Sequence, residues 1–161
     1  GKYSVYEGGT RTPFITCWPG RILPGESDEI VCTIDLPASL AALVGQPLPA
    51  HACRDSLDVS GALVGAAGAT GRDHLIQQDN GSSGAFGLRA GDWKLLRHDK
   101  GMARNRVVEG PLANTKVPRY QLFNLASDPG EQNDLFTDEP DVAPRLIAQL
   151  EAAIAAGRTR P

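Results

Sequence analysis

The 161-residue sequence is poor in the residues that usually form a metal site or a disulfide framework. It contains three cysteines and three histidines. No two of them stand at C-x-x-C or zinc-finger spacing. The odd cysteine count argues against a disulfide framework, and we expect Cys17, Cys32 and Cys53 to be buried free thiols.

The sequence also lacks the features of a membrane or nucleic-acid-binding protein. No apolar run approaches the roughly eighteen residues of a membrane span, and no signal sequence opens the chain. The net charge is −3, with lysine and arginine scattered rather than clustered. We therefore expect neither a membrane nor a nucleic acid as partner. The only methionine is Met102, so we expect the chain to be part of a longer protein.

Common catalytic motifs are absent as well. The sequence contains no G-x-S-x-G, P-loop or H-E-x-x-H pattern. The acidic stretch 128–134 lacks the alternating ligands and closing glutamate of a calcium loop. Without reference to any family, these residues do not indicate a specific reaction.

The first part of the chain predicts one strand and one helix among loops. Glu7-Gly8-Gly9-Thr10 is typical of a turn, and an extended run is expected over 14–18, ended by Pro19-Gly20. Apolar residues at helical spacing predict a helix over 30–44 with Pro37 in its first turn. Residues 46–71 predict a covering loop with one helical turn.

The second part predicts a small antiparallel sheet covered by a helix. Strands are expected at 74–78, 85–89, 93–97 and 120–124, and the link Ala90-Gly91-Asp92 is typical of a hairpin. A long loop is expected over 98–118. The apolar stripe from Val142 to Ile154 predicts a helix that Gly157 ends. Because the strands have no crossover helices between them, the fold class is α+β, and we expect two parts, 1–71 and 72–161.

Four stretches of the sequence carry recognisable family patterns. Gly1-Lys2 with the segment 6–20 matches G-K-x-x-x-x-E-G-G-x-R-x-P-x-I followed by W-P-G. Residues 35–45 match D-L-L-P-T-L-x-x-L-A-G, with the proline one place early and Ser39 in place of threonine. Residues 89–96 resemble R-x-G-x-W-K-L-I, and residues 120–135 resemble E-L-Y-D-L-x-x-D-P-x-E-x-x-N-L. In this order they resemble the C-terminal part of sulfatases, the arylsulfatase family of the alkaline phosphatase superfamily.

The resemblance changes the interpretation of Lys2, which would by default be an exposed surface lysine. In sulfatases the lysine before the E-G-G-x-R segment lies at the active site and contacts the sulfate group. An ammonium is a compact charge with three donors, suited to the charge that develops on sulfate oxygens as the S–O bond breaks. The resemblance further implies that Glu7 and Arg11 brace this loop, while Gly8 and Gly9 let it fold back.

A second motif, C-x-P-x-R from Cys17 to Arg21, matches the signature of the cysteine that sulfatases convert to formylglycine. In the family that cysteine lies far upstream, at the start of a helix beside the metal. Bulky Trp18 stands where the signature prefers a small residue. We therefore interpret the match as accidental and expect Cys17 to be a strand thiol.

The resemblance places the rest of the catalytic machinery outside this chain. Formylglycine and calcium are expected in the full-length enzyme and no cofactor or metal in this portion, which would be inactive toward aryl sulfates by itself. The implied partners are a sulfate-ester substrate and the N-terminal catalytic domain, whose C-terminal end would be residues 1–71. Residues 72–161 would form a subdomain that closes one side of the cleft. The resemblance also implies export to a periplasmic or extracellular location.

Two alternatives stay open from the sequence. One is a non-catalytic interaction module on the same fold, and the other is part of a phosphonate or phosphate ester hydrolase. The loop 98–118 is also ambiguous, since its basic residues would either face an anionic sugar or form solvated surface, the reading we favour. The basic residues that we consider are Arg104, Arg106 and Lys116 within the loop and Arg119 directly after it.

Overall fold

The computed structural model describes residues 4–79, 84–103 and 115–160. The chain forms two compact units. We call Gly1–Pro13 together with Ile76–Ala152 the sheet unit, and Phe14–Leu75 together with Ala153–Pro161 the loop unit. Compactness thus divides the chain near the expected boundary at 71/72, but it assigns the first thirteen residues to the sheet unit. The expected two domains stay a prediction.

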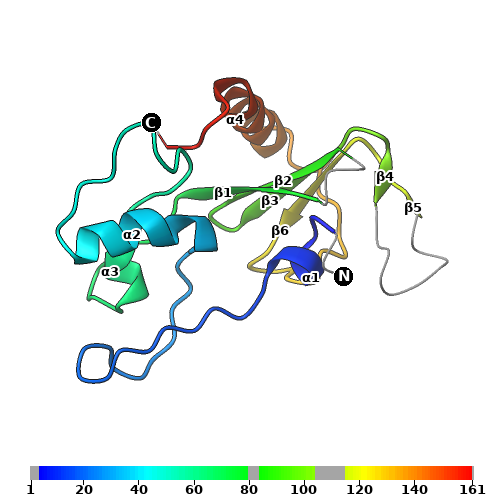
Figure 1. The fold of residues 1–161 in the computed structure, drawn as a ribbon. Coiled ribbons are helices and arrows are strands. Elements are labelled where there is room, and N and C mark those ends of the chain that lie inside the picture. Colours follow the sequence, from blue (N-terminus) through cyan, green and yellow to red (C-terminus); the bar gives the residue numbers. More distant parts are fainter. Residues whose placement is uncertain (1–3, 80–83, 104–114, 161) are drawn as a thin grey trace. The chain divides into compact units, whose positions relative to one another are not determined.

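A four-stranded sheet has the order β1-β2-β3-β6 (Figure 1). Its strands are β1 (His74–Gln78), β2 (Ala85–Ala90), β3 (Trp93–His98) and β6 (Tyr120–Asn124). β3 lies antiparallel to both β2 and β6, with Ala90 opposite Trp93 across the hairpin. Gly91 has φ +56°, a left-handed conformation that glycine adopts without strain, so this residue permits the tight link. The predicted α+β class is confirmed.

One face of the sheet is covered by helix α4 (Val142–Ala156). Successive residues of a strand point to opposite faces, and Leu88, Leu95 and Leu122 form a buried cluster with Leu146 and Leu150 of this helix. The helix ends where the sequence predicts, because Gly157 takes φ +62° and its N–H donates to the carbonyl of Ala153 at 3.0 Å.

The opposite face is covered by the N-terminal segment, an arrangement that the sequence does not predict. Val5 packs with Leu96 and Phe123 in a second buried cluster that also includes Ala85 and Leu125. Glu7–Thr10 form a single helical turn, α1, where a turn is expected (Figure 1). The sheet is therefore buried on both sides.

Two short strands, β4 (Met102–Ala103) and β5 (Thr115–Lys116), pair within the stretch expected to be a loop. Arg104 and Arg106 lie outside the described residues. Lys116 is exposed, and Arg119 is exposed with its guanidinium 5.5 Å from the centre of the Tyr120 ring.

In the loop unit, a 3₁₀ turn, η1 (Thr33–Asp35), leads into helix α2 (Leu36–Leu43), and a further turn, α3, spans Ser60–Leu63. The helix predicted over 30–44 is therefore shorter than expected. Proline fits only the first turn of an α-helix, so Pro37 requires the α-helix to begin next to it. Gly45, with φ +68°, follows its end.

Two expectations for the loop unit are wrong. Residues 14–18 do not form a strand; they are exposed and irregular, and Ile15 is 86% exposed. Within the described part of the chain no strand pairs with them, and the flanking prolines cannot donate to a ladder. Cys17 lies in this stretch and is exposed. Cys53 is also exposed and Cys32 is partly exposed, so the free thiols are not buried as expected.

Candidate active-site loop and its buried ion cluster

The structure places the sequence-predicted loop residues at the start of the sheet unit. Lys2 itself lies outside the described residues. Glu7 begins α1 and is only 6% exposed, Gly8 and Gly9 continue that turn, and Arg11 follows it on the surface. The loop is therefore fixed to the sheet by Glu7, whereas Arg11 faces solvent.

The segment before Glu7 is anchored by packing and by polar contacts. Ser4 and Val5 are 8% and 2% exposed. The Tyr6 hydroxyl donates to Gln121 Oε1 at 2.5 Å, and its ring lies 6.2 Å from that of Phe123, centre to centre. Burial, reinforced by the charges of Glu131 and Asp134, raises the pKa of Tyr6 to about 12. Tyr6 therefore stays a neutral hydrogen-bond donor at physiological pH.

A lysine from the middle of the sheet binds the Glu7 carboxylate. Lys94 lies on β3, on the face toward the N-terminal segment, and its side chain is 0% exposed. Its Nζ donates to Glu7 Oε1 at 2.7 Å and to Thr10 Oγ1 at 3.3 Å, and it lies 3.4 Å from Glu131 Oε1. Because the ammonium is completely buried, we infer that Lys94 supports the loop and does not meet a substrate.

Glu131 joins the same cluster from the turn after β6. Its Oε2 accepts a hydrogen bond from the Glu7 N–H at 2.6 Å. Glu131 has φ +53°, a conformation that costs a non-glycine residue about 1–3 kcal/mol and that persists where the surroundings enforce it. Asp128 holds this turn, since its backbone carbonyl accepts from the Glu131 N–H at 3.1 Å and its Oδ2 accepts from the Asn133 N–H at 2.8 Å.

The cluster is dense in charge and incompletely hydrogen-bonded. Arg89 of β2 contributes a weaker contact, with Nη1 3.9 Å from Glu7 Oε2. Glu7 Oε2 and Glu131 Oε1 are buried without a hydrogen bond in the described part of the chain. Burial raises the pKa of Glu131 above its ordinary value, while the Lys94 charge and the Glu7 N–H oppose the shift.

A polar chain extends from Tyr6 along the same face. His98 is 1% exposed, and its Nε2 lies 3.0 Å from Gln121 Oε1, the acceptor that Tyr6 also uses. Burial lowers the pKa of His98, and the Gln121 hydrogen bond and nearby aspartates only partly offset this effect. His98 is therefore a neutral structural residue at physiological pH.

Sequence reasoning missed Lys94, Glu131 and Arg89 as members of this site. Each lies inside a stretch that carries a family pattern, but the patterns do not reveal that three of these stretches meet at one cluster. The sequence contained one signal for Lys94. This lysine stands between the apolar residues Trp93 and Leu95 in a predicted strand. A lysine at an inward position of a buried strand needs a carboxylate partner.

The loop unit contains its own buried ion pair. Asp35 and Arg72 both have side chains that are 0% exposed, and Arg72 Nη1 donates to Asp35 Oδ1. The same oxygen accepts from the Leu57 N–H at 2.9 Å. This pair ties the start of α2 to the segment that leads into β1, and its role is structural.

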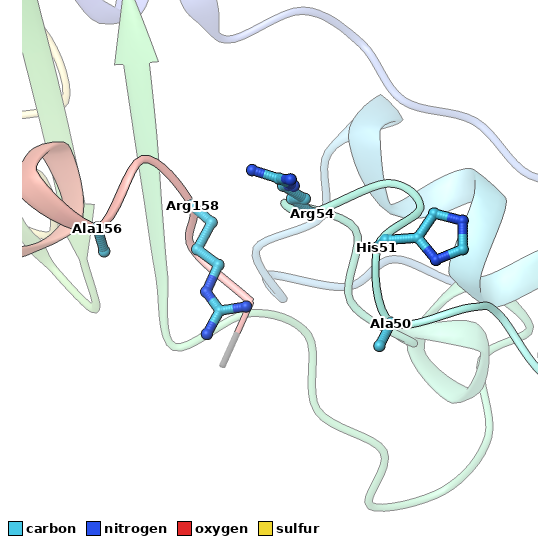
Figure 2. Close-up of a pocket in the computed structure, with 5 residues that line it drawn as sticks. All are labelled: Ala50, His51, Arg54, Ala156 and Arg158. Carbon is cyan, nitrogen blue, oxygen red and sulfur yellow. The ribbon is translucent and has the colours of Figure 1, made fainter.

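A surface hollow of the loop unit is lined by Ala50, His51, Arg54, Ala156 and Arg158. Figure 2 shows the His51 ring directed away from Arg158 across the hollow. The lining contains neither a carboxylate nor a nucleophile, so the hollow does not provide the groups of a hydrolytic site.

Within the described residues, no three histidine, cysteine, aspartate or glutamate side chains gather in a way that could hold a metal ion. The calcium that the sulfatase resemblance implies is expected outside this chain, and that expectation stays a prediction. In the same part of the chain, no helix is long and apolar enough to cross a membrane.

Comparison with known proteins places these features in a family. No protein-family profile matches the sequence. An N-acetylgalactosamine-6-O-sulfatase of Bacteroides thetaiotaomicron is 37% identical over 152 residues, which cover 94% of this chain and 29% of that protein. Arylsulfatase A of Homo sapiens is 32% identical over 98% of this chain and 34% of that protein.

The fold agrees with this relationship. A solved structure from work on glycosaminoglycan metabolism by Bacteroides thetaiotaomicron has a TM-score of 0.80 and 34% sequence identity, covering 95% of this chain and 31% of that one. The chain thus spans about a third of the length of the relatives that it matches. From the shared sequence and the shared fold together, we conclude that this chain belongs to the sulfatase family.

Proposed function

We propose that this chain is the C-terminal portion of a sulfuric ester hydrolase and supplies Lys2 as a contact to the sulfate group. The observation that supports this role most is the anchoring of the loop behind Lys2. The segment from Ser4 to Thr10 is buried in part, packed on the sheet and tied to it by the Lys94–Glu7 ion pair. A catalytic cation has to be held in a fixed position to stabilise charge in a transition state.

The chemistry of Lys2 follows from its ammonium group. Hydrolysis of a sulfate ester shifts negative charge onto the leaving oxygen and the sulfate oxygens as the S–O bond breaks. An ammonium at that position stabilises the transition state more than the ground state and therefore raises the rate. We propose that the nucleophile, formylglycine, and calcium belong to the remainder of a longer protein. We also propose that this longer protein is exported.

One face of the loop unit supports the proposal that a catalytic α/β domain is the partner of this chain. Helix α2 is turned with its small residues inward: Ala38 and Ser39 are 8% and 0% exposed, whereas Leu40 is 56% exposed and Val44, directly after the helix, is 69% exposed. Ser39 Oγ accepts from the Val59 N–H at 3.0 Å, so the inward face is fixed by hydrogen bonding. Large apolar side chains that are exposed next to one another are typical of an interaction surface. We propose that the catalytic α/β domain covers this face, since the relatives are about three times as long as this chain.

The test of the proposed function uses the full-length protein. Lys2→Ala should reduce kcat/KM for a chromogenic aryl sulfate by about 100- to 1,000-fold, the usual effect of losing one such donor. Arg145→Ala serves as the matched control, because it removes one positive charge from the exposed surface of α4. Wild-type kinetics in the Lys2 variant would contradict the proposal. Faster turnover of the corresponding phosphate or phosphonate ester than of the sulfate would instead favour a related hydrolase.

A further inference from the structure

We propose that Lys94 and Glu131 are positioning residues, which fix the loop that carries Lys2 and act on catalysis only through it. This inference rests on the proposed role of Lys2 as the sulfate contact. It goes beyond that role because it assigns a function to two residues that the substrate does not touch.

The burial of Lys94 gives the first argument. Taking an ammonium and two carboxylates out of water costs several kcal/mol per ion, and an apolar replacement of such a cluster is often equally stable or more stable. Lys94 is 0% exposed, while the Glu7 and Glu131 side chains are 7% and 4% exposed. Folding of the sheet alone therefore does not require charge at this position. What the charge adds is a defined geometry between a rigid strand and a loop.

The contacts show which geometry is defined. Lys94 Nζ holds the loop at two points, the Glu7 carboxylate at 2.7 Å and the Thr10 hydroxyl at 3.3 Å. Glu131 holds the backbone of the loop at Glu7, whose N–H donates to the Glu131 carboxylate at 2.6 Å. β3 lies between β2 and β6 inside the sheet, so Lys94 extends from a rigid element of the unit.

The backbone of Glu131 gives an independent argument. Its φ of +53° is unfavourable for a residue with a Cβ, and glycine would adopt it without strain. The side chain is nevertheless present and directed into the cluster, where it accepts the Glu7 N–H. The strain is thus compensated by the contact that fixes the loop.

The route to Lys2 is short. Val5 is 2% exposed and packed with Leu96 and Phe123, and Lys2 precedes it by three positions. Because Lys2 is joined to this segment through so few bonds of the chain, we expect a displacement of the segment to displace Lys2. A misplacement of a catalytic group by about 1 Å can lower the rate by about 100-fold.

A double-mutant cycle in the full-length protein tests the inference. Lys94→Met and Glu131→Gln are each made in the wild type and in Lys2→Ala, and kcat/KM is measured with a chromogenic aryl sulfate. If they act through Lys2, each should lower kcat/KM by about 10- to 100-fold in the wild type and by less than about twofold in the Lys2→Ala background. An equal loss in both backgrounds would show a merely structural role and overturn the inference.

Two further variants keep the test decisive. The single variant Lys94→Met leaves two buried carboxylates unpaired, which can prevent folding. The triple change Glu7→Gln, Lys94→Met and Glu131→Gln removes all three charges together, so it should fold even where Lys94→Met alone does not. It should show the same dependence on Lys2. Arg97→Met is the matched control, because Arg97 also lies on β3 but pairs with Glu151 of α4 at 2.8 Å; it should lower stability without lowering kcat/KM. An unchanged kcat/KM in Lys2→Ala would refute the proposed function itself, which distinguishes the two failures.

Discussion

The substitution Asp35→Asn tests how far the loop unit depends on its buried ion pair. It keeps the size of the side chain and removes its charge. Asp35 and Arg72 have side chains that are both 0% exposed, and Arg72 also donates to the Asp55 carbonyl at 3.0 Å and to Thr159 Oγ1 at 3.1 Å. The variant would leave the Arg72 charge buried without its carboxylate.

The expected loss follows from this burial. Removing one partner of a buried pair costs about 3–5 kcal/mol, whereas exposed pairs contribute about 0–1 kcal/mol. A chain of this length shifts its Tm by about 2–4 °C for each kcal/mol, so Asp35→Asn should lower Tm by roughly 6–20 °C. The double variant Asp35→Asn with Arg72→Met should lose about 1–3 kcal/mol less than the sum of the two single variants.

The assay is thermal and urea denaturation followed by circular dichroism. Asp73→Asn is the matched control, because Asp73 is the residue next to Arg72 and its side chain is 83% exposed. The control should stay within about 0.5 kcal/mol of the wild type. If Asp35→Asn were as mild as Asp73→Asn, the argument that burial makes this pair essential to the loop unit would be refuted.

Two further predictions concern His98 and helix α2. Because burial lowers the pKa of His98 below 6.5, the unfolded chain binds a proton at His98 more readily than the folded chain does. The free energy of unfolding should therefore be highest above pH 6.5 and decrease as pH falls toward the lowered pKa. In urea denaturation, His98→Gln should remove this part of the pH dependence, and an unchanged profile would contradict the assignment. Leu40→Gln should leave the Tm of the 161-residue chain nearly unchanged, since Leu40 is 56% exposed, but lower the Tm of the full-length protein. Equal effects in the two proteins would argue against a covered α2 face.

Much of the sheet unit was predictable from local patterns. The strands, the hairpin at Gly91 and the helix ended by Gly157 each follow from a periodicity or a glycine within a few residues. The prediction of a strand at 14–18 is wrong because a strand needs a hydrogen-bonded partner strand, and a local pattern does not show whether one is present. The burial expected for Cys17 failed with it.

The candidate site was predictable only in part. The order of the four family patterns points to the sulfatase family and to Lys2, which lies outside the described residues and keeps its role as a prediction. The residues that hold the loop were not predictable, because the contact between Glu7 and Lys94 joins positions 87 apart in the chain. The contact between Glu7 and Glu131 joins positions 124 apart.

The sequence by itself therefore determined the family, the α+β class and the succession of elements, since these depend on composition, periodicity and motif order. Only the tertiary structure decided that the second face of the sheet is covered by the N-terminal segment, and that three of the family stretches meet in one buried cluster of charges. The physical reason is the alternation of side chains along β3. It directs Leu95 to helix α4 and Lys94 to the loop, and the partners of both are fixed by how the chain folds back rather than by its local sequence.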